Sequence, residues 1–280
     1  MSLIKALVCL TALSVLLSAF ALTLLFWYEA KNSPEARVPA PDWGYLKRGL
    51  QFFLNLAEIV CGLLLLPFGP LVRAFFQRPG ATERKDLPML VFIHGLYHNA
   101  STWLYMAWFL RKKGFRMRFF TYGRFTPLPA ISEDFGNFMR RPDFQGARPL
   151  IVAHSMGGLI ARACLADRAF EEGVAGVVTL GTPHAGSKLA VLAVGKWNQA
   201  RFLESGSEFL RSLQDAPAPA IPCVSLAGTA DEMVLPASSL VPPPGWTLKL
   251  VPNAAHLSML FCPSTCAALL DELERINLRC

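Results

Sequence analysis

The segment PLIVAHSMGG, residues 149–158, delivers a serine to the end of a short apolar run. A serine hydroxyl is a weak nucleophile, so it needs a neighbouring base and a fixed geometry before it attacks a carbonyl. The small residues Ala153 and Gly157 flank Ser155, as a sharp strand-to-helix turn that exposes a nucleophile requires. The alternative interpretation is a glycine-rich helix start without chemistry. Because a strand-like run precedes Ser155 and a helix-like run follows it, we favour the nucleophile.

An acid and a base follow in chain order. Asp231, in LAGTADEMVLP, and His256, in VPNAAHLSML, each come after an apolar run. A histidine beside a serine takes its proton, and a carboxylate orients the imidazole. Glu232 is the reserve candidate for the acid, and Asp215 fits less well. His154 adjoins the serine, but neighbouring side chains on a strand point to opposite sides, so we expect it to shape the turn instead.

Two backbone N–H groups are needed to bind the charge that develops on the attacked carbonyl oxygen. Met156, directly after the serine at a helix start, is predicted to supply one. The loop HGLYHNASTW is predicted to supply the other through Leu96, because Gly95 permits a tight bend. Gly158 is expected to allow close helix–strand packing.

These residues must be positioned by a regular framework, and the sequence from about residue 86 onward predicts one. Short apolar runs alternate with helical stretches, which indicates an α/β fold with a mostly parallel sheet covered on both faces. In such sheets chemistry gathers at the carboxyl ends of the strands. Strands are predicted within 87–95, 115–122, 148–155, 174–183, 222–231 and 247–256, and helices within 101–114, 132–141, 157–169, 187–197, 206–215 and 264–279.

The first 80 residues have a different composition. Residues 6–28 carry no charge and end in Trp27 and Tyr28, which is typical of a membrane-spanning helix with an aromatic boundary. A cleaved signal peptide is the alternative. A second apolar stretch, residues 49–72, places a few polar residues on one helical face: Gln51, Asn55, Glu58 and Gly62. This face is predicted either to pack on the first span or to face water while the helix lies in the interface. Pro67 and Pro70 should break or kink its end.

The chain therefore divides into a membrane-anchoring region, residues 1–80, and a catalytic domain, residues 86–280. With Lys5 on the cytoplasmic side of a bacterial inner membrane, two spans would return the catalytic domain to the cytoplasm, although basic residues in the intervening loop oppose this topology. The net charge of +7 is accompanied by no nucleic-acid-binding signature, so nucleic acid is not an expected partner. The seven scattered cysteines predict neither a disulfide framework nor a metal site, and no cofactor is expected.

Several motifs together, FIHGLYHNASTW, AHSMGG, LGTPHAGS, AGTADEMV and AAHLSML, resemble those of the α/β-hydrolases, in particular the bacterial triacylglycerol lipase and esterase branch. The resemblance covers about residues 87–275. It implies the α/β-hydrolase fold, Ser155 as nucleophile, Asp231 as acid and His256 as base, with Leu96 and Met156 as oxyanion donors. It also implies a small helical cap over about residues 185–216. Some lipases of this group bind calcium, but no clear pair of carboxylates for it is found here.

The expected function is a membrane-anchored serine hydrolase that cleaves carboxylic esters, in particular lipid esters, through an acyl-enzyme. Trp103 and Leu189 are predicted to contact the apolar part of the substrate. Two alternatives stay open. The first is an acyltransferase, which forms the same acyl-enzyme but passes the acyl group to an acceptor other than water. The second is a catalytically idle, membrane-tethered binding protein on the same fold. The sequence does not fix the oligomeric state.

Overall fold

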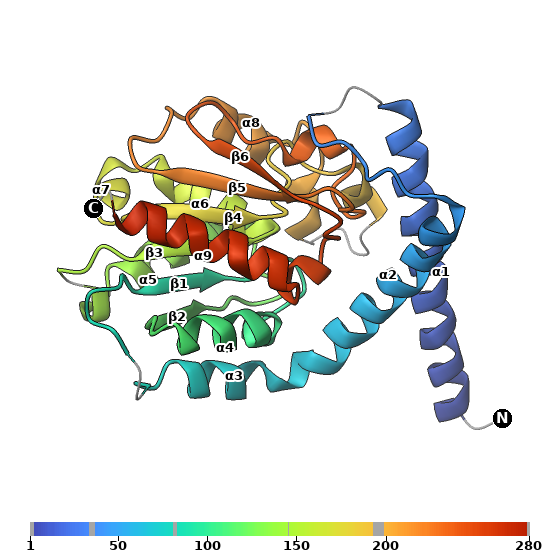
Figure 1. Cartoon of the computed structure of the whole chain (residues 1–280), viewed down its shortest axis with the longest axis horizontal. Coiled ribbons are helices and arrows are strands. Elements are labelled where there is room, and N and C mark those ends of the chain that lie inside the picture. Colours follow the sequence, from blue (N-terminus) through green and yellow to red (C-terminus); the bar gives the residue numbers. More distant parts are fainter. Residues whose placement is uncertain (1–2, 34–36, 81–82, 145, 193–198, 279–280) are drawn as a thin grey trace.

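The computed structural model describes residues 3–33, 37–80, 83–144, 146–192 and 199–278. Six parallel strands form one sheet in the order β2-β1-β3-β4-β5-β6 (Figure 1). The strands are β1 Leu90–Ile93, β2 Met117–Phe120, β3 Leu150–His154, β4 Gly176–Leu180, β5 Cys223–Gly228 and β6 Thr247–Val251. Each lies within a range predicted from the sequence, and the α/β fold class is confirmed.

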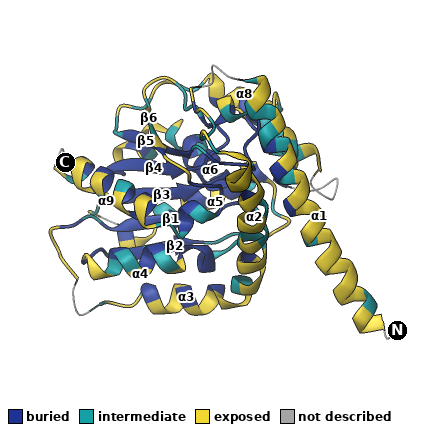
Figure 2. Cartoon of the chain, turned by 45° about the vertical axis from the view of Figure 1, so that its right-hand side comes forward, coloured by how far each residue is buried: buried dark blue, intermediate teal, exposed yellow. Residues whose placement is uncertain are grey.

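Helices cover both faces of the sheet, which explains why the central strands β1, β3, β4 and β5 are buried at every position and mostly apolar. The helices of the domain are α4 Leu104–Lys112, α5 Leu128–Met139, α6 Met156–Leu165, α7 Arg168–Glu172, α8 Glu208–Gln214 and α9 Pro263–Asn277. One core cluster joins the sheet to α4 and α9, and a second joins it to α5, α6 and α8. Strands β1, β3 and β4 are buried at every residue, whereas the edge strand β6 is largely open to solvent (Figure 2).

The predicted cap over residues 185–216 is only partly described. Residues 193–198 of it lie outside the described residues. The described part consists of two 3-10 turns, Lys188–Leu192 and Gln199–Leu203, followed by α8. The first turn replaces the start of the α-helix that we predicted at 187–197.

The N-terminal region forms two long apolar helices. α1 spans Leu3–Asn32, and α2, Tyr45–Leu65, continues through a 3-10 turn, Leu66–Phe68, into α3, Gly69–Phe76. Pro67 lies in that turn and Pro70 in the first turn of α3, so the predicted break is confirmed. By length and composition alone, both stretches are candidate membrane spans. Figure 1 shows the start of α1 projecting from the domain, while α2 and α3 run along it.

The polar face of α2 packs partly on α1, as one of our two alternatives predicted, and partly on the catalytic domain, which neither alternative included. Gln51 Nε2 donates to the carbonyl of Ala230 (3.5 Å). A Cβ at Gly62 would lie 3.2 Å from His98 Cε1. Of the polar positions, Asn55 contacts α1, where its Nδ2 donates to Thr23 Oγ1 (3.0 Å). Helical periodicity reveals such a face but not the surface that covers it.

The start of α6 lies exceptionally close to the loop after β4. A Cβ at Gly158 would lie 2.0 Å from Thr182 Oγ1 and 2.9 Å from Thr182 Cβ. Thr182 is fully buried and its hydroxyl donates to the carbonyl of Ser155 (3.0 Å). The predicted role of Gly158 in close helix–strand packing is therefore confirmed.

We predict that Gly158→Ala lowers the free energy of unfolding by about 1–3 kcal/mol, because the new methyl group overpacks a buried contact. The matched control is Gly136→Ala in α5, where the nearest atom to a new Cβ is Arg140 Nη1 at 3.8 Å. There the substitution should stabilise by about 0.5–1 kcal/mol, through helix propensity. Denaturant unfolding of the two variants measures the difference. Equal stabilities would contradict the packing assigned to Gly158.

Candidate active site

Ser155 occupies a strained turn between β3 and α6. Its backbone angles are φ 53° and ψ −124°, in a region that non-glycine residues rarely adopt. Such a conformation costs about 1–3 kcal/mol and persists only where the surroundings hold it. Here the N–H of Ser155 donates to the carbonyl of Leu180 (2.8 Å). A Cβ at Gly157 would meet the carbonyl oxygen of Ile93 at 2.5 Å, so this turn has no room for a side chain there.

His256 and Asp231 form a buried pair. His256 Nδ1 and Asp231 Oδ2 are 2.8 Å apart, and the two side chains are 6% and 0% exposed. The other carboxylate oxygen, Oδ1, accepts the N–H groups of Met233 (3.1 Å) and Val234 (3.0 Å). The turn after β5 therefore fixes the carboxylate, and the carboxylate fixes the imidazole. This geometry favours Asp231 over Glu232 as the acid.

The backbone of His256 is held by two further side chains whose role the sequence did not indicate. Its N–H donates to Glu232 Oε2 (3.2 Å), and its carbonyl accepts from His154 Nε2 (3.0 Å). Burial lowers the pKa of His154 well below its ordinary value, so the ring is neutral. Burial also raises the pKa of Glu232 well above its ordinary value, and the carboxylates of Glu58 and Asp231 raise it further. Glu232 and His154 therefore position the backbone of His256, the candidate base, and are not themselves candidates for the base.

The strained turn at Ser155, called the elbow below, and the His256–Asp231 pair meet at the carboxyl ends of β3 and β4. A Cβ at Gly181, which directly follows Leu180, would lie 3.1 Å from both Asp231 Oδ2 and His256 Nδ1. The structure thus brings the three predicted triad residues to one point of the sheet edge. No hydrogen bond joins Ser155 Oγ to His256 Nε2 among the residues described. In enzymes without bound substrate, catalytic hydrogen bonds are often long or poorly aligned.

The two predicted oxyanion donors flank the serine. Met156 is the first residue of α6, so its N–H has no partner within the helix. Gly95, at the end of β1, approaches so closely that a Cβ there would lie 3.0 Å from Ser155 Cβ. The N–H of Leu96, the next residue, has no hydrogen-bond acceptor in the described part of the chain. The N–H groups of Leu96 and Met156 are therefore free of other acceptors in the described part of the chain, as the predicted role requires.

A family model described as "Alpha/beta hydrolase family" matches residues 90–269. The chain belongs to the α/β-hydrolase family. The match extends from the first strand of the sheet into α9 and includes the elbow, the His–Asp pair and both oxyanion donors. It leaves out α1, α2 and α3.

Solved structures with the same fold include several lipases. A Bacillus licheniformis lipase in mature form is 21% identical, with a TM-score of 0.58, over 70% of this chain and 96% of the lipase. A monoacylglycerol lipase of Paleococcus ferrophilus is 16% identical (TM-score 0.53), over 69% of this chain and 96% of that one. A putative lipase from Acinetobacter baumannii is 12% identical (TM-score 0.52), over 76% and 97%. No curated protein matches the sequence significantly.

The two residues predicted to contact substrate have different surroundings in this hydrolase. Trp103 is 1% exposed and packs in the core, with its ring centroid 4.8 Å from that of Phe92. It also meets His154 edge-on at 6.4 Å between ring centroids. Trp103 therefore supports the residues behind the site and offers no surface to a substrate, which corrects our prediction. Leu189 is half-buried in the 3-10 turn after β4.

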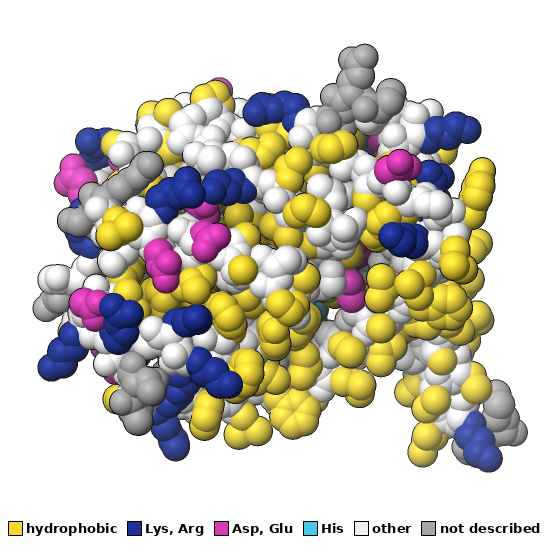
Figure 3. All heavy atoms as spheres, viewed as in Figure 1, with side chains coloured by type: hydrophobic (Ala, Val, Ile, Leu, Met, Phe, Trp, Pro, Cys, Tyr) yellow, Lys and Arg dark blue, Asp and Glu magenta, His cyan; other side chains and the backbone are white. Residues whose placement is uncertain are grey.

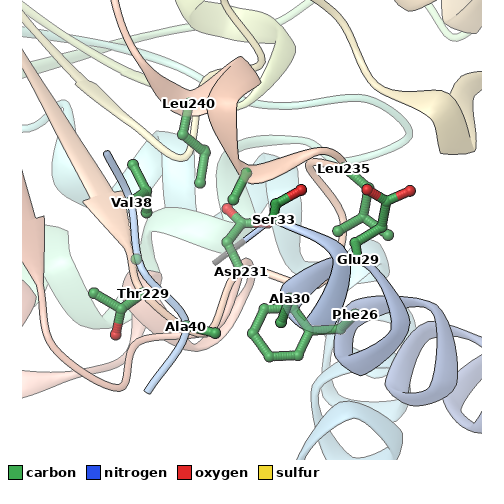
Figure 4. Close-up of a pocket in the computed structure, with 12 residues that line it drawn as sticks. Phe26, Glu29, Ala30, Ser33, Val38, Ala40, Thr229, Asp231, Leu235 and Leu240 are labelled. Atoms are coloured by element: carbon green, nitrogen blue, oxygen red, sulfur yellow. The ribbon is translucent and has the colours of Figure 1, made fainter. Parts of the chain in front are cut away.

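Two cavities adjoin the site. One, shown in Figure 4, lies between the end of α1 and the loop after β5, with Phe26, Glu29 and Asp231 among its lining residues. Its volume of about 20 Å³ is sufficient for about one water molecule. The other, of about 410 Å³, lies beside the oxyanion loop and is large enough for part of a substrate. Its lining includes His94 and Tyr97 of that loop.

We predict that Asp231→Asn lowers kcat for ester hydrolysis about 10⁴-fold, because an amide can hold the imidazole in the wrong tautomer. The matched control is Glu232→Gln, which keeps a side-chain oxygen for the His256 N–H and should change kcat by less than about 10-fold. Steady-state kinetics on a soluble short-chain aryl ester measure both. A severe loss in Glu232→Gln with an active Asp231→Asn would instead make Glu232 the acid.

Proposed function

We propose that the protein is a serine hydrolase of carboxylic esters that works through an acyl-enzyme on Ser155. The observation that carries the proposal is the buried His256–Asp231 pair at the sheet edge where the strained turn holds Ser155. Strain at a single non-glycine residue beside such a pair is typical of a site built for nucleophilic catalysis.

In this mechanism His256 Nε2 accepts the proton of Ser155 Oγ as that oxygen attacks the ester carbonyl carbon. Asp231 stabilises the imidazolium that forms, and the N–H groups of Leu96 and Met156 bind the oxyanion. His256 then gives its proton to the leaving alcohol as the C–O bond breaks. Water, deprotonated by the same imidazole, releases the carboxylic acid and restores Ser155.

We predict that Ser155→Ala lowers kcat for a short-chain aryl ester by about 10⁴-fold or more, because it removes the nucleophile. It should also prevent covalent labelling by a fluorophosphonate probe. The matched control is Ser212→Ala, which changes an exposed serine on α8 whose hydroxyl donates only to the carbonyl of Phe209. The control should keep both properties. Undiminished turnover or labelling in Ser155→Ala would overturn the proposal.

We also propose that the substrate is a lipid ester taken from a membrane to which the N-terminal helices attach. Many apolar side chains of α1, α2 and α3 face outward: Phe53 is 61% exposed, Leu64 67%, Leu71 66% and Phe75 57%. Hydrophobic side chains gather along the right-hand and lower edges of the molecule in Figure 3, over these helices. So large an exposed apolar surface is typical of contact with lipid. The lipases with the same fold support a lipid substrate.

The two helices attach differently in this proposal. α1 is 30 residues long, and its N-terminal part projects from the domain. The whole helix, about 45 Å at 1.5 Å per residue, is long enough to span the bilayer. α2 and α3 lie along the catalytic domain, with their polar side against it and their apolar side outward, so they dip into the interface without crossing it. The membrane side of the catalytic domain stays a prediction from the flanking charges.

We predict that the exposed thiols Cys9 of α1 and Cys61 of α2 resist a membrane-impermeant maleimide when the protein is in lipid vesicles. Lipid excludes both the reagent and the thiolate that it needs. Cys262, half-buried at the start of α9, is the matched control and should react. A Cys280→Ser background and peptide mass spectrometry assign each label, and unfolding in SDS shows the full reactivity. Labelling of Cys61 as fast as Cys262 would contradict an interfacial α2.

A further inference from the structure

The cavity of about 410 Å³ lies on the side of Ser155 away from the base. Ser155 follows β3, and the sheet order places β1 and β2 on one side of it and β4, β5 and β6 on the other. His256 and Asp231 come from the loops after β6 and β5. The cavity is lined by His94 after β1 and by Tyr122 and Arg124 after β2. A substrate group in this cavity would therefore lie apart from the base.

Most residues in the walls of the cavity are polar, and one of them, Arg124, carries a positive charge. Arg124 is exposed and has no carboxylate partner within ion-pair distance among the described residues. Burial lowers the pKa of His94 and of His98 to about 4, so both rings are neutral at pH 7. No acidic side chain is among the lining residues that the structure describes. This electrostatic environment favours a single negative charge.

Two lining residues also carry hydrogen-bond acceptors without a partner. His94 Nδ1 lies 2.9 Å from the carbonyl of Gly95, which can only accept, so the neutral ring has its proton on Nδ1 and a free lone pair on Nε2. The Gln199 amide nitrogen donates to the carbonyls of Gly123 (2.7 Å) and Thr126 (3.0 Å). His94 Nε2 and Gln199 Oε1 are both buried without a partner in the described structure. A ligand that brings hydroxyl donors would satisfy them.

The cavity also borders the apolar helices. Leu66 and Pro67 line it at the junction of α2 and α3, and their neighbours Leu64 and Phe68 are 67% and 50% exposed. Lipid chains on that surface would thus lie within a few residues of the polar cavity. This arrangement suits a molecule with a polar head and apolar chains.

We propose that this cavity is the headgroup subsite of the hydrolase and that it takes a phosphodiester with free hydroxyl groups, such as the glycerol headgroup of an anionic phospholipid. Arg124 binds the phosphate, and the acceptors on His94 and Gln199 receive the hydroxyl groups. The proposal rests on the function proposed above, because it assigns the substrate class of the same site. Arg124 is a specificity residue and takes no part in the chemical steps.

The test compares three lipids with identical acyl chains in detergent mixed micelles: phosphatidylglycerol, phosphatidylmethanol and diacylglycerol. Fatty-acid release by the full chain should be fastest from phosphatidylglycerol. Arg124→Gln should lower kcat/KM for both phospholipids about 10-fold, through loss of a charge-assisted hydrogen bond, and leave diacylglycerol unchanged. Arg124→Lys should restore part of the loss. The matched control, Arg275→Gln on the exposed side of α9, should change none of the three.

Equal effects of Arg124→Gln on all three lipids, or on none, would overturn the proposal. Equal rates on phosphatidylglycerol and phosphatidylmethanol would remove the hydroxyl part of it. A second measurement does not depend on turnover: calorimetry of Ser155→Ala protein with glycerophosphoglycerol, a singly charged phosphodiester with free hydroxyl groups, should show binding that Arg124→Gln abolishes and that glycerol or inorganic phosphate alone matches poorly. If Ser155 is not the nucleophile, this binding still tests the subsite, and no binding would refute it.

Discussion

The conformation of Ser155 is the constraint on which the rest of the site depends. Two hydrogen bonds maintain its positive φ. The N–H of Ser155 donates to the carbonyl of Leu180, and the hydroxyl of Thr182 donates to the carbonyl of Ser155. Two consecutive glycines let α6 start where any side chain would collide with β1 or with the loop after β4. Since the strain costs about 1–3 kcal/mol, close packing around the turn is needed to keep it. The serine is thereby presented at the sheet edge before any substrate binds.

His256, the candidate base, is also held in place by its surroundings, as Ser155 is. His256 is held at three atoms: Nδ1 by Asp231, the backbone N–H by Glu232 and the carbonyl by His154. All three partners are buried: Asp231 and Glu232 are consecutive residues of the loop after β5, and His154 ends β3. A side chain restrained in this way loses little further freedom when the reaction begins, which is the condition for electrostatic preorganisation. In the proposed mechanism Nε2 is the ring nitrogen that would face the serine and the leaving alcohol, because Nδ1 is bound to Asp231.

Local patterns in the sequence predicted the six strands, because buried parallel strands have a distinct composition. They also predicted that Ser155, Asp231 and His256 lie at one edge of the sheet, because the carboxyl ends of parallel strands lie side by side. They failed where the answer depends on contacts between distant segments. A tryptophan near a site looks the same in sequence whether it packs in the core or lines a pocket, and Trp103 does the former. The 410 Å³ cavity combines residues from 66 to 199, a combination that no periodicity reveals.

α2 lies between the proposed membrane surface and the candidate active site. On a water-soluble protein, an amphipathic helix turns its apolar side to the core and its polar side to water. α2 does the reverse: Gln51, Asn55 and Gly62 are buried, while Leu50, Phe53 and Leu64 are exposed. Its polar side reaches His98 and the carbonyl of Ala230, next to Asp231. In the proposed attachment, lipid on one side of this single helix would lie one helix diameter, about 10 Å, from the candidate active site on the other side. A soluble catalytic domain without α2 would expose that edge to water.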